Sequence, residues 1–346
     1  MTLQHQIADA FATSTPLSIC GGASKQFLGN QVAGEPLSTA EHRGVINYQP
    51  DELVMTVRSG TPLQEIKDIL HAQHQRLAFE PPSFGDTATI GGTFACGLSG
   101  PSRPWAGSAR DSLLGCTIIN GRGEKLHFGG EVIKNVAGYD ASRLMVGAFG
   151  TLGLIMDVSF RVLPVPTTEI TLSFSVDTSQ AVTKVVSWSQ KPLPITAAAW
   201  LDGELLIRLS GAQAAIRAAQ LQLGGEDSNQ AEFWLQLREQ QLDFFQTGKP
   251  LWRLSLPMAA APLNIPGAEQ LIEWGGAQRW LLSRERPQTI RQAALTAGGH
   301  ATCFRNVQGG DIFTPLSKPM LALQQRLKKA FDPKGILNPG RIYTDL

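Results

Sequence analysis

Between residues 80 and 111 the sequence reads EPPSFGDTATIGGTFACGLSGPSRPWAGSARD, where glycine, proline and other small residues replace most side chains that build a regular core. This run is too long for an ordinary connection, because unstructured loops beyond about 12–15 residues are usually functional or disordered. Disorder is not expected, since apolar side chains such as Ile90 and Phe94 are interleaved with the glycines. We therefore predict a shaped surface on which Gly91 and Gly92 let the backbone approach a large, phosphate-bearing cofactor.

Two further clusters of small residues occur elsewhere in the chain. A short strand expected over residues 16–20 runs directly into Gly21-Gly22-Ala23-Ser24-Lys25, where free amides and a hydroxyl could hold a pyrophosphate. The other cluster, GAFGTLG at residues 147–153, also has spacing for close backbone approach. The first cluster is not a G-x-G-x-x-G motif with an acidic residue about 20 positions later, so we exclude a nicotinamide Rossmann site. Because these clusters are far apart in the sequence yet similar in character, we predict that they come together to bind one shared ligand.

Composition limits the remaining classes of function. The 346 residues suffice for about two domains of roughly 150 residues each, and a net charge of +1 offers no basic stripe for nucleic acid. The apolar runs fall short of the roughly 20 residues that a membrane helix needs, and the N-terminus lacks the apolar segment of a signal peptide, so we expect a cytoplasmic protein. Four scattered cysteines without a Cys-x-x-Cys pair support neither a zinc site nor an iron–sulfur cluster.

Apolar periodicity and turn residues predict an α+β chain whose character changes near Pro164. Helices are expected over residues 2–12, 213–223, 231–244, 287–297 and 318–331. A further helix is expected to open with Thr61 as its N-cap and Gln64 in the capping-box position. Strands are expected over residues 16–20, 52–59, 113–119, 125–128, 170–176, 205–209 and 251–256, with a hairpin between 113–119 and 125–128. The first domain should contain a mixed or antiparallel sheet, and the second should again be α+β.

Taken together, the small-residue clusters resemble the FAD-binding module of the vanillyl-alcohol oxidase and p-cresol methylhydroxylase (PCMH) type. The resemblance runs in family order over residues 21–24, 89–95, 107–111, 138–153 and 332–340. Within that family, the segments GPSRPWAGSARD, GGEVIKNVAGYD, SRLMVGAFGTLG and EQLIEWGGAQRW are similar to the E subunits of bacterial glycolate oxidases, also called glycolate dehydrogenases. The resemblance implies a two-lobed FAD-binding domain over residues 1–164, divided at residue 50, a smaller α+β cap domain over 165–310, and a return to the first domain over 311–346.

The resemblance also implies which residues hold the cofactor. The diphosphate is expected at residues 21–25 and 91–93, the adenine end near Gly150, Gly153 and Ile155, and the flavin ring near Ser108 and Asn338. The full set of cofactor-binding candidates is Gly21, Gly22, Ala23, Ser24, Lys25, Pro82, Thr89, Gly91, Gly92, Thr93, Gly97, Ser99, Ser108, Gly150, Gly153, Ile155 and Asn338.

Several positions depart from the family pattern. Residues 21–29 contain neither histidine nor cysteine where covalently flavinylated members carry histidine, which implies a noncovalent flavin. Gly97 replaces the family's asparagine, and Ala148-Phe149 replaces its Ser-Glu pair. Larger relatives that oxidise 2-hydroxy acids carry a histidine cluster, H-x-G-D-G-N-x-H, in a longer cap domain. In that neighbourhood this chain has only His300, with Arg305 beyond it.

His300 and Arg305 are the catalytic candidates. His300 either takes a hydroxyl proton as a general base while hydride passes to the flavin, or is a surface or capping residue, which is the interpretation we favour. Arg103, Arg110 and Arg305 either hold a substrate carboxylate through paired hydrogen bonds or serve the structure, the latter being favoured for Arg110 through a neighbouring carboxylate. Trp105 either covers the flavin or belongs to the core.

The resemblance implies an FAD-binding subunit of a complex that oxidises glycolate, a 2-hydroxy acid, to the 2-oxo acid. Electrons would pass to a sister flavoprotein subunit and an iron–sulfur subunit, with no nucleic acid and no transmembrane segment involved. The complex would be cytoplasmic or attached to a membrane through its partners. Two alternatives stay open: a self-sufficient FAD-dependent 2-hydroxy-acid dehydrogenase, and a structural subunit with a degenerate flavin site.

Overall fold

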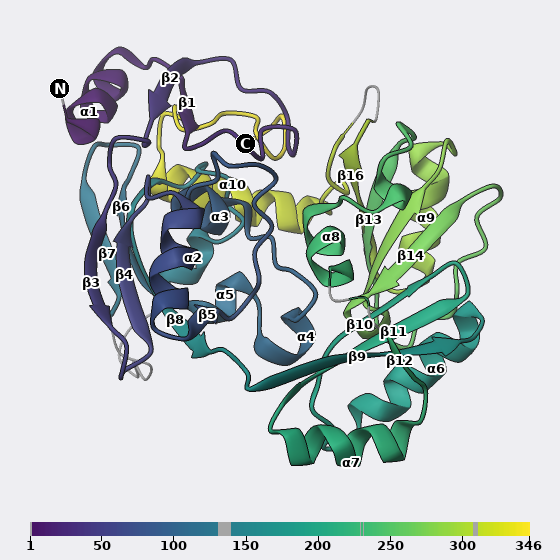
Figure 1. The fold of residues 1–346 in the computed structure, drawn as a ribbon. Coiled ribbons are helices and arrows are strands. Elements are labelled where there is room, and N and C mark those ends of the chain that lie inside the picture. Colours follow the sequence, from purple (N-terminus) through teal and green to yellow (C-terminus); the bar gives the residue numbers. More distant parts are fainter. Residues whose placement is uncertain (1, 131–139, 229, 231, 307–310) are drawn as a thin grey trace. The chain divides into compact units, whose positions relative to one another are not determined.

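The chain divides into two units in the computed structural model (Figure 1), which describes residues 2–130, 140–228, 230, 232–306 and 311–346. Unit 1 comprises Met1–Ser99, Gly107–Pro164 and Pro315–Leu346, and unit 2 comprises Gly100–Ala106 and Val165–Thr314. Each unit contains both helices and sheets, so the predicted α+β class is confirmed. No helix within the described residues is long and apolar enough to span a membrane.

Unit 1 is built on a six-stranded antiparallel sheet with the order β3-β4-β8-β6-β7, to which β5 adds by pairing with β8. Its strands are β3 (Val45–Gln49), β4 (Val54–Arg58), β5 (Gln75–Leu77), β6 (Leu113–Ile119), β7 (Lys125–Gly129) and β8 (Leu154–Pro164). The predicted hairpin is confirmed, because β6 and β7 pair directly on either side of the turn at Asn120.

Two helices cover the core of this sheet. The predicted apolar spacing of α2 (Leu63–Ala72) is confirmed, since Leu63, Ile66 and Leu70 are fully buried. They pack in one cluster with Phe94 of α3 (Ile90–Cys96) and with apolar side chains of the sheet. Burying side chains of this size stabilises the fold by roughly 1.5–3 kcal/mol each. The sheet and these helices therefore form a rigid base beneath the glycine-rich segment.

The start of α2 differs from the prediction. Pro62 occupies the N-cap position, and neither Thr61 nor Gln64 forms a capping box. The Thr61 hydroxyl instead donates to the Arg58 carbonyl at 2.7 Å and accepts from the Gly44 amide at 2.9 Å. Leu63 donates its amide to the Ala88 carbonyl, which keeps the backbone extended up to Pro62. The Thr61 hydroxyl is therefore used by tertiary hydrogen bonds and does not cap the helix, contrary to what the local sequence pattern predicts.

Residues from both ends of the chain join in unit 1. Helix α1 (Leu3–Thr13), predicted over residues 2–12, is capped by Thr2 and precedes β1 (Leu17–Cys20). Strand β1 pairs in parallel with β2 (Glu35–Ser38). Near the C-terminus, α10 (Lys318–Phe331) spans the predicted range, and Leu337 beyond it forms a bridge with Leu17. Ile336, Leu337 and the apolar side chains of α1 and β1 share one small core.

The run over residues 80–111 contains regular structure that the sequence did not predict. Besides α3 it forms two single-turn helices, α4 (Arg103–Ala106) and α5 (Ala109–Ser112), and α4 belongs to unit 2. A 3₁₀ turn, η1 (Ser142–Met145), begins the segment SRLMVGAFGTLG. Most of the preceding segment GGEVIKNVAGYD, including Gly138 and Tyr139 of the family motif, lies outside the described residues.

Unit 2 is built on one eight-stranded antiparallel sheet with the order β12-β9-β11-β10-β14-β15-β13-β16. Its strands are β9 (Thr168–Ser175), β10 (Ile195–Leu201), β11 (Glu204–Gly211), β12 (Glu226–Ser228), β13 (Leu251–Ser255), β14 (Glu269–Glu273), β15 (Gln278–Leu282) and β16 (His300–Arg305). The strands predicted over residues 170–176, 205–209 and 251–256 are confirmed as β9, β11 and β13.

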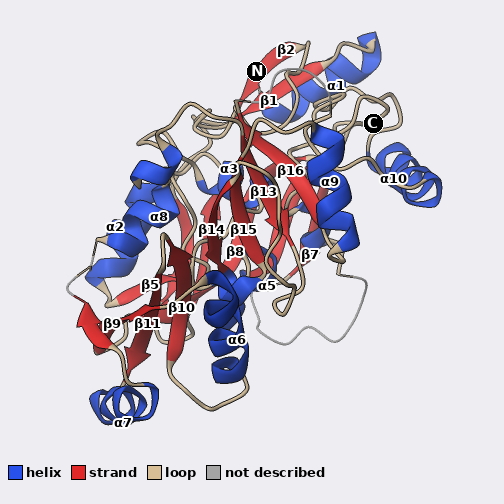
Figure 2. Ribbon diagram, turned by 90° about the vertical axis from the view of Figure 1, so that its right-hand side faces the viewer, coloured by secondary structure: helices blue, strands red, loops and turns tan. Residues whose placement is uncertain are grey.

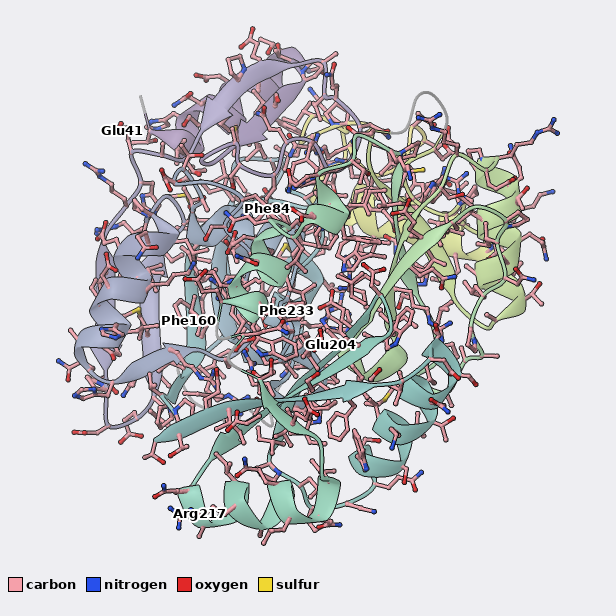
Figure 3. The ribbon with its side chains drawn as sticks, turned by 45° about the vertical axis from the view of Figure 1, so that its right-hand side comes forward. Glu41, Phe84, Phe160, Glu204, Arg217 and Phe233 are labelled. Carbon is pink, nitrogen blue, oxygen red and sulfur yellow. The ribbon has the colours of Figure 1, made fainter. Side chains whose placement is uncertain are left out.

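Helices pack on this sheet through separate apolar clusters. Helices α6 (Thr178–Ser189) and α7 (Gln213–Leu223) contribute to one cluster, and α9 (Pro287–Thr296) packs beside β16 in another (Figure 2). The amphipathic character of α7 is plain in Figure 3, where Arg217 points outward while the preceding Ile216 is buried. The predicted ranges of α7 and α9 are confirmed to within one residue.

The helix predicted over residues 231–244 is wrong in length. Helix α8 covers only Phe233–Glu239, and a 3₁₀ turn, η2 (Asp243–Phe245), follows it. Gln240 interrupts the helix because its φ of 55° lies in the left-handed region. Its buried side chain shows that packing, rather than local helix propensity, sets this end. Ala231 lies outside the described residues.

Candidate functional site

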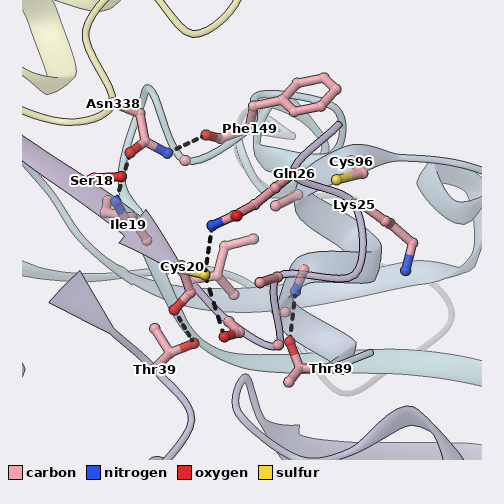
Figure 4. Close-up of a pocket in the computed structure, with 18 of the residues that line it drawn as sticks. Ser18, Ile19, Cys20, Lys25, Gln26, Thr39, Thr89, Cys96, Phe149 and Asn338 are labelled. Atoms are coloured by element: carbon pink, nitrogen blue, oxygen red, sulfur yellow. Dashed lines mark hydrogen bonds between the residues drawn. The ribbon is translucent and has the colours of Figure 1, made fainter. Parts of the chain in front are cut away.

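A cavity of about 340 Å³ lies in unit 1 (Figure 4), within the roughly 300–1,000 Å³ that small-molecule sites occupy. Four segments far apart in the sequence converge on it: the end of β1 with the turn that follows, helix α3, the residues around Phe149, and the C-terminal segment at Asn338. The predicted cofactor residues that line this cavity are Gly21, Gly22, Ala23, Ser24, Lys25, Thr89, Gly91, Gly92, Gly150, Gly153, Ile155 and Asn338.

The turn after β1 presents unused backbone donors. Within the described part of the chain, the amides of Gly22, Ala23 and Ser24 donate no hydrogen bond. Ala23 adopts a left-handed conformation with φ of 60°, which turns successive amides toward one side. Gly22 must be glycine, because a Cβ there would lie 1.3 Å from the Thr87 carbonyl oxygen. This turn is therefore a backbone cradle of the kind that binds anionic oxygens.

Helix α3 presents a different surface. The Gly91 amide donates to the Ser59 carbonyl, and the Gly92 amide donates to the Thr89 hydroxyl, which caps the helix. The cap and the neighbouring strand therefore use both amides, so these two glycines offer close backbone approach without free donors. A Cβ on Gly91 would lie 2.5 Å from the Ser59 Cβ, whereas one on Gly92 would meet the Thr89 hydroxyl at 3.2 Å. Gly91 serves packing, and Gly92 leaves room in the cavity.

Asn338 ties three walls of the cavity together (Figure 4). Its buried side-chain oxygen accepts from the Ile19 amide at 2.7 Å, and its side-chain nitrogen donates to the Phe149 carbonyl at 2.6 Å. Gly150 follows with φ of 74°, and a Cβ there would lie 2.8 Å from the Asn338 nitrogen. Strand β1, the Phe149 turn and the C-terminal segment are thus fixed by one amide group.

Behind this junction lies a buried ion pair. Lys328 of α10 bonds the Asp332 carboxylate at 2.8 Å and also donates to the carbonyls of Thr151 and Leu337. Asp332 in turn accepts from the amides of Ile336 and Leu337. Burial lowers the pKa of Lys328, an effect that the adjacent Asp332 carboxylate opposes. The pair holds the turn that delivers Asn338 to the cavity.

Among the described residues that line the cavity, the charged side chains are two cations. Lys25 is buried and donates to the Ser24 hydroxyl and the Ser83 carbonyl, each at 3.2 Å. Arg341 donates to the carbonyls of Leu28 and Asn30 at 2.6 and 2.5 Å. Burial raises the pKa of the Cys96 thiol to about 11, although Lys25 and Arg341 act in the opposite direction. The cavity is consequently electropositive and suited to an anion.

Five of the predicted cofactor residues do not line the cavity. Thr93 is buried and donates its hydroxyl to the Thr89 carbonyl, and Gly97 ends α3 with φ of 64°. Ser99 accepts from the Ala109 amide, and Ser108 caps α5 through a capping box with Asp111. The fifth, Pro82, is buried. Their part in cofactor binding stays a prediction.

Other lining residues were not singled out from the sequence. They are Ser18, Ile19, Cys20, Gln26, Gln31, Val32, Thr39, Ser59, Ala95, Cys96, Phe149 and Arg341. Thr39 and Ser59 come from strand ends that pairing with distant partners brings to the cavity, so no local pattern marked them. Arg341 directly follows the predicted C-terminal motif. Its position close to Asn338 in the sequence could have identified it as a cavity residue.

The two catalytic candidates lie in unit 2 on the edge strand β16. His300 is exposed. Partial burial lowers its pKa, and the charge of Arg253 lowers it further to a smaller extent. The Arg305 guanidinium lies 6.0 Å from the Phe304 ring. The roles of both residues stay predictions.

Two further expectations concern arginine and tryptophan side chains. Arg110 was expected to pair with a neighbouring carboxylate, but among the described residues it forms no ion pair and donates to the Val146 carbonyl at 3.5 Å. Trp105 packs against the α6 and α7 core of unit 2, in line with the core alternative. Trp252, Trp274 and Trp280 are likewise buried in unit 2.

Comparison with known proteins gives two family matches. Residues 2–129 match a family described as an FAD binding domain, and residues 314–342 match the C-terminal domain of FAD linked oxidases. The chain is 49% identical over 344 residues to the glycolate oxidase subunit GlcE of Escherichia coli strain K12, an alignment that covers 99% of this chain and 97% of that protein.

More distant relatives share part of the chain. The glycolate oxidase subunit GlcD of Bacillus subtilis strain 168 is 30% identical over 145 residues, which cover 41% of this chain and 30% of that protein. Among solved structures, an alkyldihydroxyacetonephosphate synthase superposes with a TM-score of 0.69 at 16% identity, covering 97% of this chain and 75% of that chain. That similarity supports the fold alone.

Proposed function

The chain belongs to the family of FAD-binding glycolate oxidase E subunits, and from that premise we propose that it is the FAD-carrying subunit of a complex that oxidises glycolate. The identity of 49% to the glycolate oxidase subunit GlcE over almost the whole of both chains is the observation that carries the proposal. The electropositive cavity, with its cradle of free amides, supports the same assignment.

The residues at the cavity fit an FAD. The amides of Gly22, Ala23 and Ser24 would donate to diphosphate oxygens, and Lys25 would supply a positive charge beside them. Because Gly92 lines the cavity without a side chain, a flat group could lie against α3 there. We propose that the cofactor is held without a covalent bond, because residues 21–29 carry neither histidine nor cysteine.

When bound, the flavin of FAD supplies an acceptor for a hydride and a donor of single electrons. The chain's own residues would orient it: Asn338 fixes the wall formed by Phe149 and Gly150, and Arg341 fixes the loop over residues 26–30. Walls fixed in this way would hold the cofactor in one orientation.

We propose that a sister flavoprotein subunit oxidises the substrate and that an iron–sulfur subunit takes the electrons onward. If this chain oxidised glycolate by itself, His300 and Arg305 would be its candidates for the base and the carboxylate clamp. The lowered pKa of His300 leaves its imidazole neutral near pH 7, as a base requires. We also propose a cytoplasmic location, with any membrane attachment made through the partner subunits.

Anaerobic titration of the purified chain tests the proposal. We expect a yellow protein, or an apoprotein that takes up FAD one to one, whose flavin band is not bleached by glycolate until the sister subunit is added. Bleaching of the isolated chain by glycolate would instead identify a self-sufficient dehydrogenase. A colourless protein that cannot be reconstituted with FAD would indicate a structural subunit and overturn the assignment.

A further inference from the structure

A polar cluster on the sheet of unit 2 is not used by the proposed function. It combines Arg253 of β13, Gln278 and Trp280 of β15, and the end of β14 at Glu273. Arg253 lies opposite Trp280 in the pairing of β13 with β15, and Glu273 lies opposite Gln278 in the pairing of β14 with β15. These side chains therefore share one face of the sheet, since residues directly opposite on paired strands point the same way.

The cluster holds the Arg253 side chain in one orientation. Its Nε donates to the Gln278 side-chain oxygen at 2.6 Å, and the Gln278 side-chain nitrogen donates to the Glu273 carboxylate. Trp280 donates its indole N–H to the same carboxylate oxygen at 2.6 Å. Within the described residues, the two terminal nitrogens of Arg253 form no hydrogen bond. The chain of buried bonds thus leaves the guanidinium fork anchored at Nε and open at its end.

A second guanidinium lies on the same indole ring. The Cζ of Arg103, in α4, is 4.4 Å from the centre of the Trp274 ring, and the Cζ of Arg253 is 5.3 Å from it. The Trp274 indole N–H donates to the Gly100 carbonyl at 2.9 Å, which fixes the segment that carries Arg103. Arg103 is exposed, so the cluster is open to solvent on that side.

The backbone at Trp274 is strained. Trp274 has φ of 55°, and Gly275 and Gly276 follow with φ of 67° and 104°. A left-handed conformation costs free energy for a residue with a Cβ, and such residues concentrate at binding and catalytic sites. With this backbone, the centre of the Trp274 ring lies within 5.3 Å of the guanidinium carbons of both Arg103 and Arg253.

The charges of the cluster do not balance near neutral pH. Burial raises the pKa of Glu273 to about 7, against the effects of its hydrogen bonds and of Arg253. Burial, and then the charge of Arg103, lower the pKa of Arg253 to about 10, so this side chain stays protonated. His300 lies opposite Ser255 on the neighbouring strand, and burial with the charge of Arg253 lowers its pKa. Arg253 is therefore a cation whose neighbouring carboxylate, Glu273, is only partly ionised near pH 7.

We infer that Arg103, Trp274 and Arg253 form a binding site for the carboxylate group of a small organic acid. The open fork of Arg253 matches the two oxygens of a carboxylate, and Arg103 supplies the second charge from the other part of the unit. The ring of Trp274 keeps both guanidinium planes in place and partly shields them from water. The site lies wholly in unit 2, so the inference does not depend on FAD binding.

Calorimetric titration of the full-length purified chain with oxalate at low ionic strength tests this site. We expect saturable binding of one oxalate, weakened at least tenfold in Arg253→Met and in Arg103→Met. Arg253→Lys should lose most of the affinity, because an ammonium keeps the charge without the fork. Arg291→Met is the matched control, since Arg291 stacks on Trp252 at 5.6 Å in the same unit; its oxalate affinity should be unchanged.

The outcomes separate this inference from the proposed function. Every variant should keep its flavin content, and Arg103→Met should also keep its unfolding midpoint, as absorbance and circular dichroism report; Arg253→Met loses its bond to Gln278 and is compared at a temperature where it stays folded. Absence of oxalate binding in the wild type overturns the inference, as does equal affinity in Arg103→Met, an exposed position whose replacement does not threaten folding. Tighter binding of inorganic phosphate than of oxalate would also overturn it, because the ligand class would then be wrong.

Discussion

At the scale of single residues, the two neighbouring glycines of α3 carry different constraints. Gly92 lines the cavity, and its helical φ makes a side chain acceptable to the backbone. Gly92→Val should therefore fold normally but lose FAD, because the added side chain fills cofactor space. Gly91→Val should instead lower the unfolding midpoint, because its Cβ would meet Ser59 at 2.5 Å. Flavin-to-protein absorbance and thermal denaturation distinguish the two, and a fully yellow Gly92→Val would contradict the placement.

Asn338 gives a second prediction at this scale. Asn338→Asp keeps the acceptor for the Ile19 amide but cannot donate to the Phe149 carbonyl, and it adds a buried charge facing that oxygen. The unpaired groups should cost roughly 1–3 kcal/mol of unfolding free energy. Denaturant unfolding of the apoprotein measures this cost, and a variant with wild-type stability would show that the bridge is dispensable.

Sequence patterns located the cavity through glycines but misjudged what each glycine does. Gly21, Gly22 and Gly150 were predicted at the cavity and line it. Backbone approach to the cofactor was predicted at Gly91 and Gly92, yet Ser59 and Thr89 use their amides. Ser59 comes from the end of a distant strand, which a local pattern does not contain, whereas Thr89 is the local N-cap of the same helix.

At the scale of elements, the junction between α10 and the C-terminal turn depends on one buried ion pair. Lys328→Met should leave Asp332 as an unpaired buried charge and cost about 3–5 kcal/mol of unfolding free energy. Lys329→Met, an exposed neighbour on the same helix, should change stability by less than about 0.5 kcal/mol. Urea denaturation of both variants compares these values, and equal effects would refute the role assigned to the pair.

Helices and strands with clear apolar periodicity were predicted well, whereas those set by tertiary packing were not. Helices α7 and α10 match their predicted ranges because their polar and apolar faces are separated in the sequence. Helix α3 escaped prediction because two of its seven residues are glycine, which local propensity disfavours. Helix α8 ends early at Gln240, whose left-handed backbone has no signature in the sequence.

At the scale of the whole molecule, the buried carboxylate in unit 2 makes stability depend on pH. The pKa of Glu273 is about 7 in the folded state and 4.5 in the unfolded state, so folding favours the protonated form. The folded chain then binds more protons between these values, so the contribution of Glu273 to stability is fully present below pH 4.5 and is lost as pH rises through 7. The shift corresponds to on the order of 3 kcal/mol.

Glu273→Gln should remove this dependence, since the amide oxygen still accepts from Trp280 but does not ionise. Unfolding free energies measured from pH 5 to pH 8 should fall for the wild type and stay nearly level for the variant. Glu269→Gln, on the same strand but exposed and paired with Lys249, should keep the wild-type slope. A wild-type curve without slope would mean that Glu273 is ionised throughout.

The bridge between Leu17 and Leu337 has a consequence for the order of events in the cell. A ribosome makes β1 more than three hundred codons before Asn338, so the cavity walls cannot close while the residues between them are being synthesised. Cofactor loading must therefore follow translation of that late segment. Premature termination upstream of it would yield a chain that folds its central sheet but stays colourless.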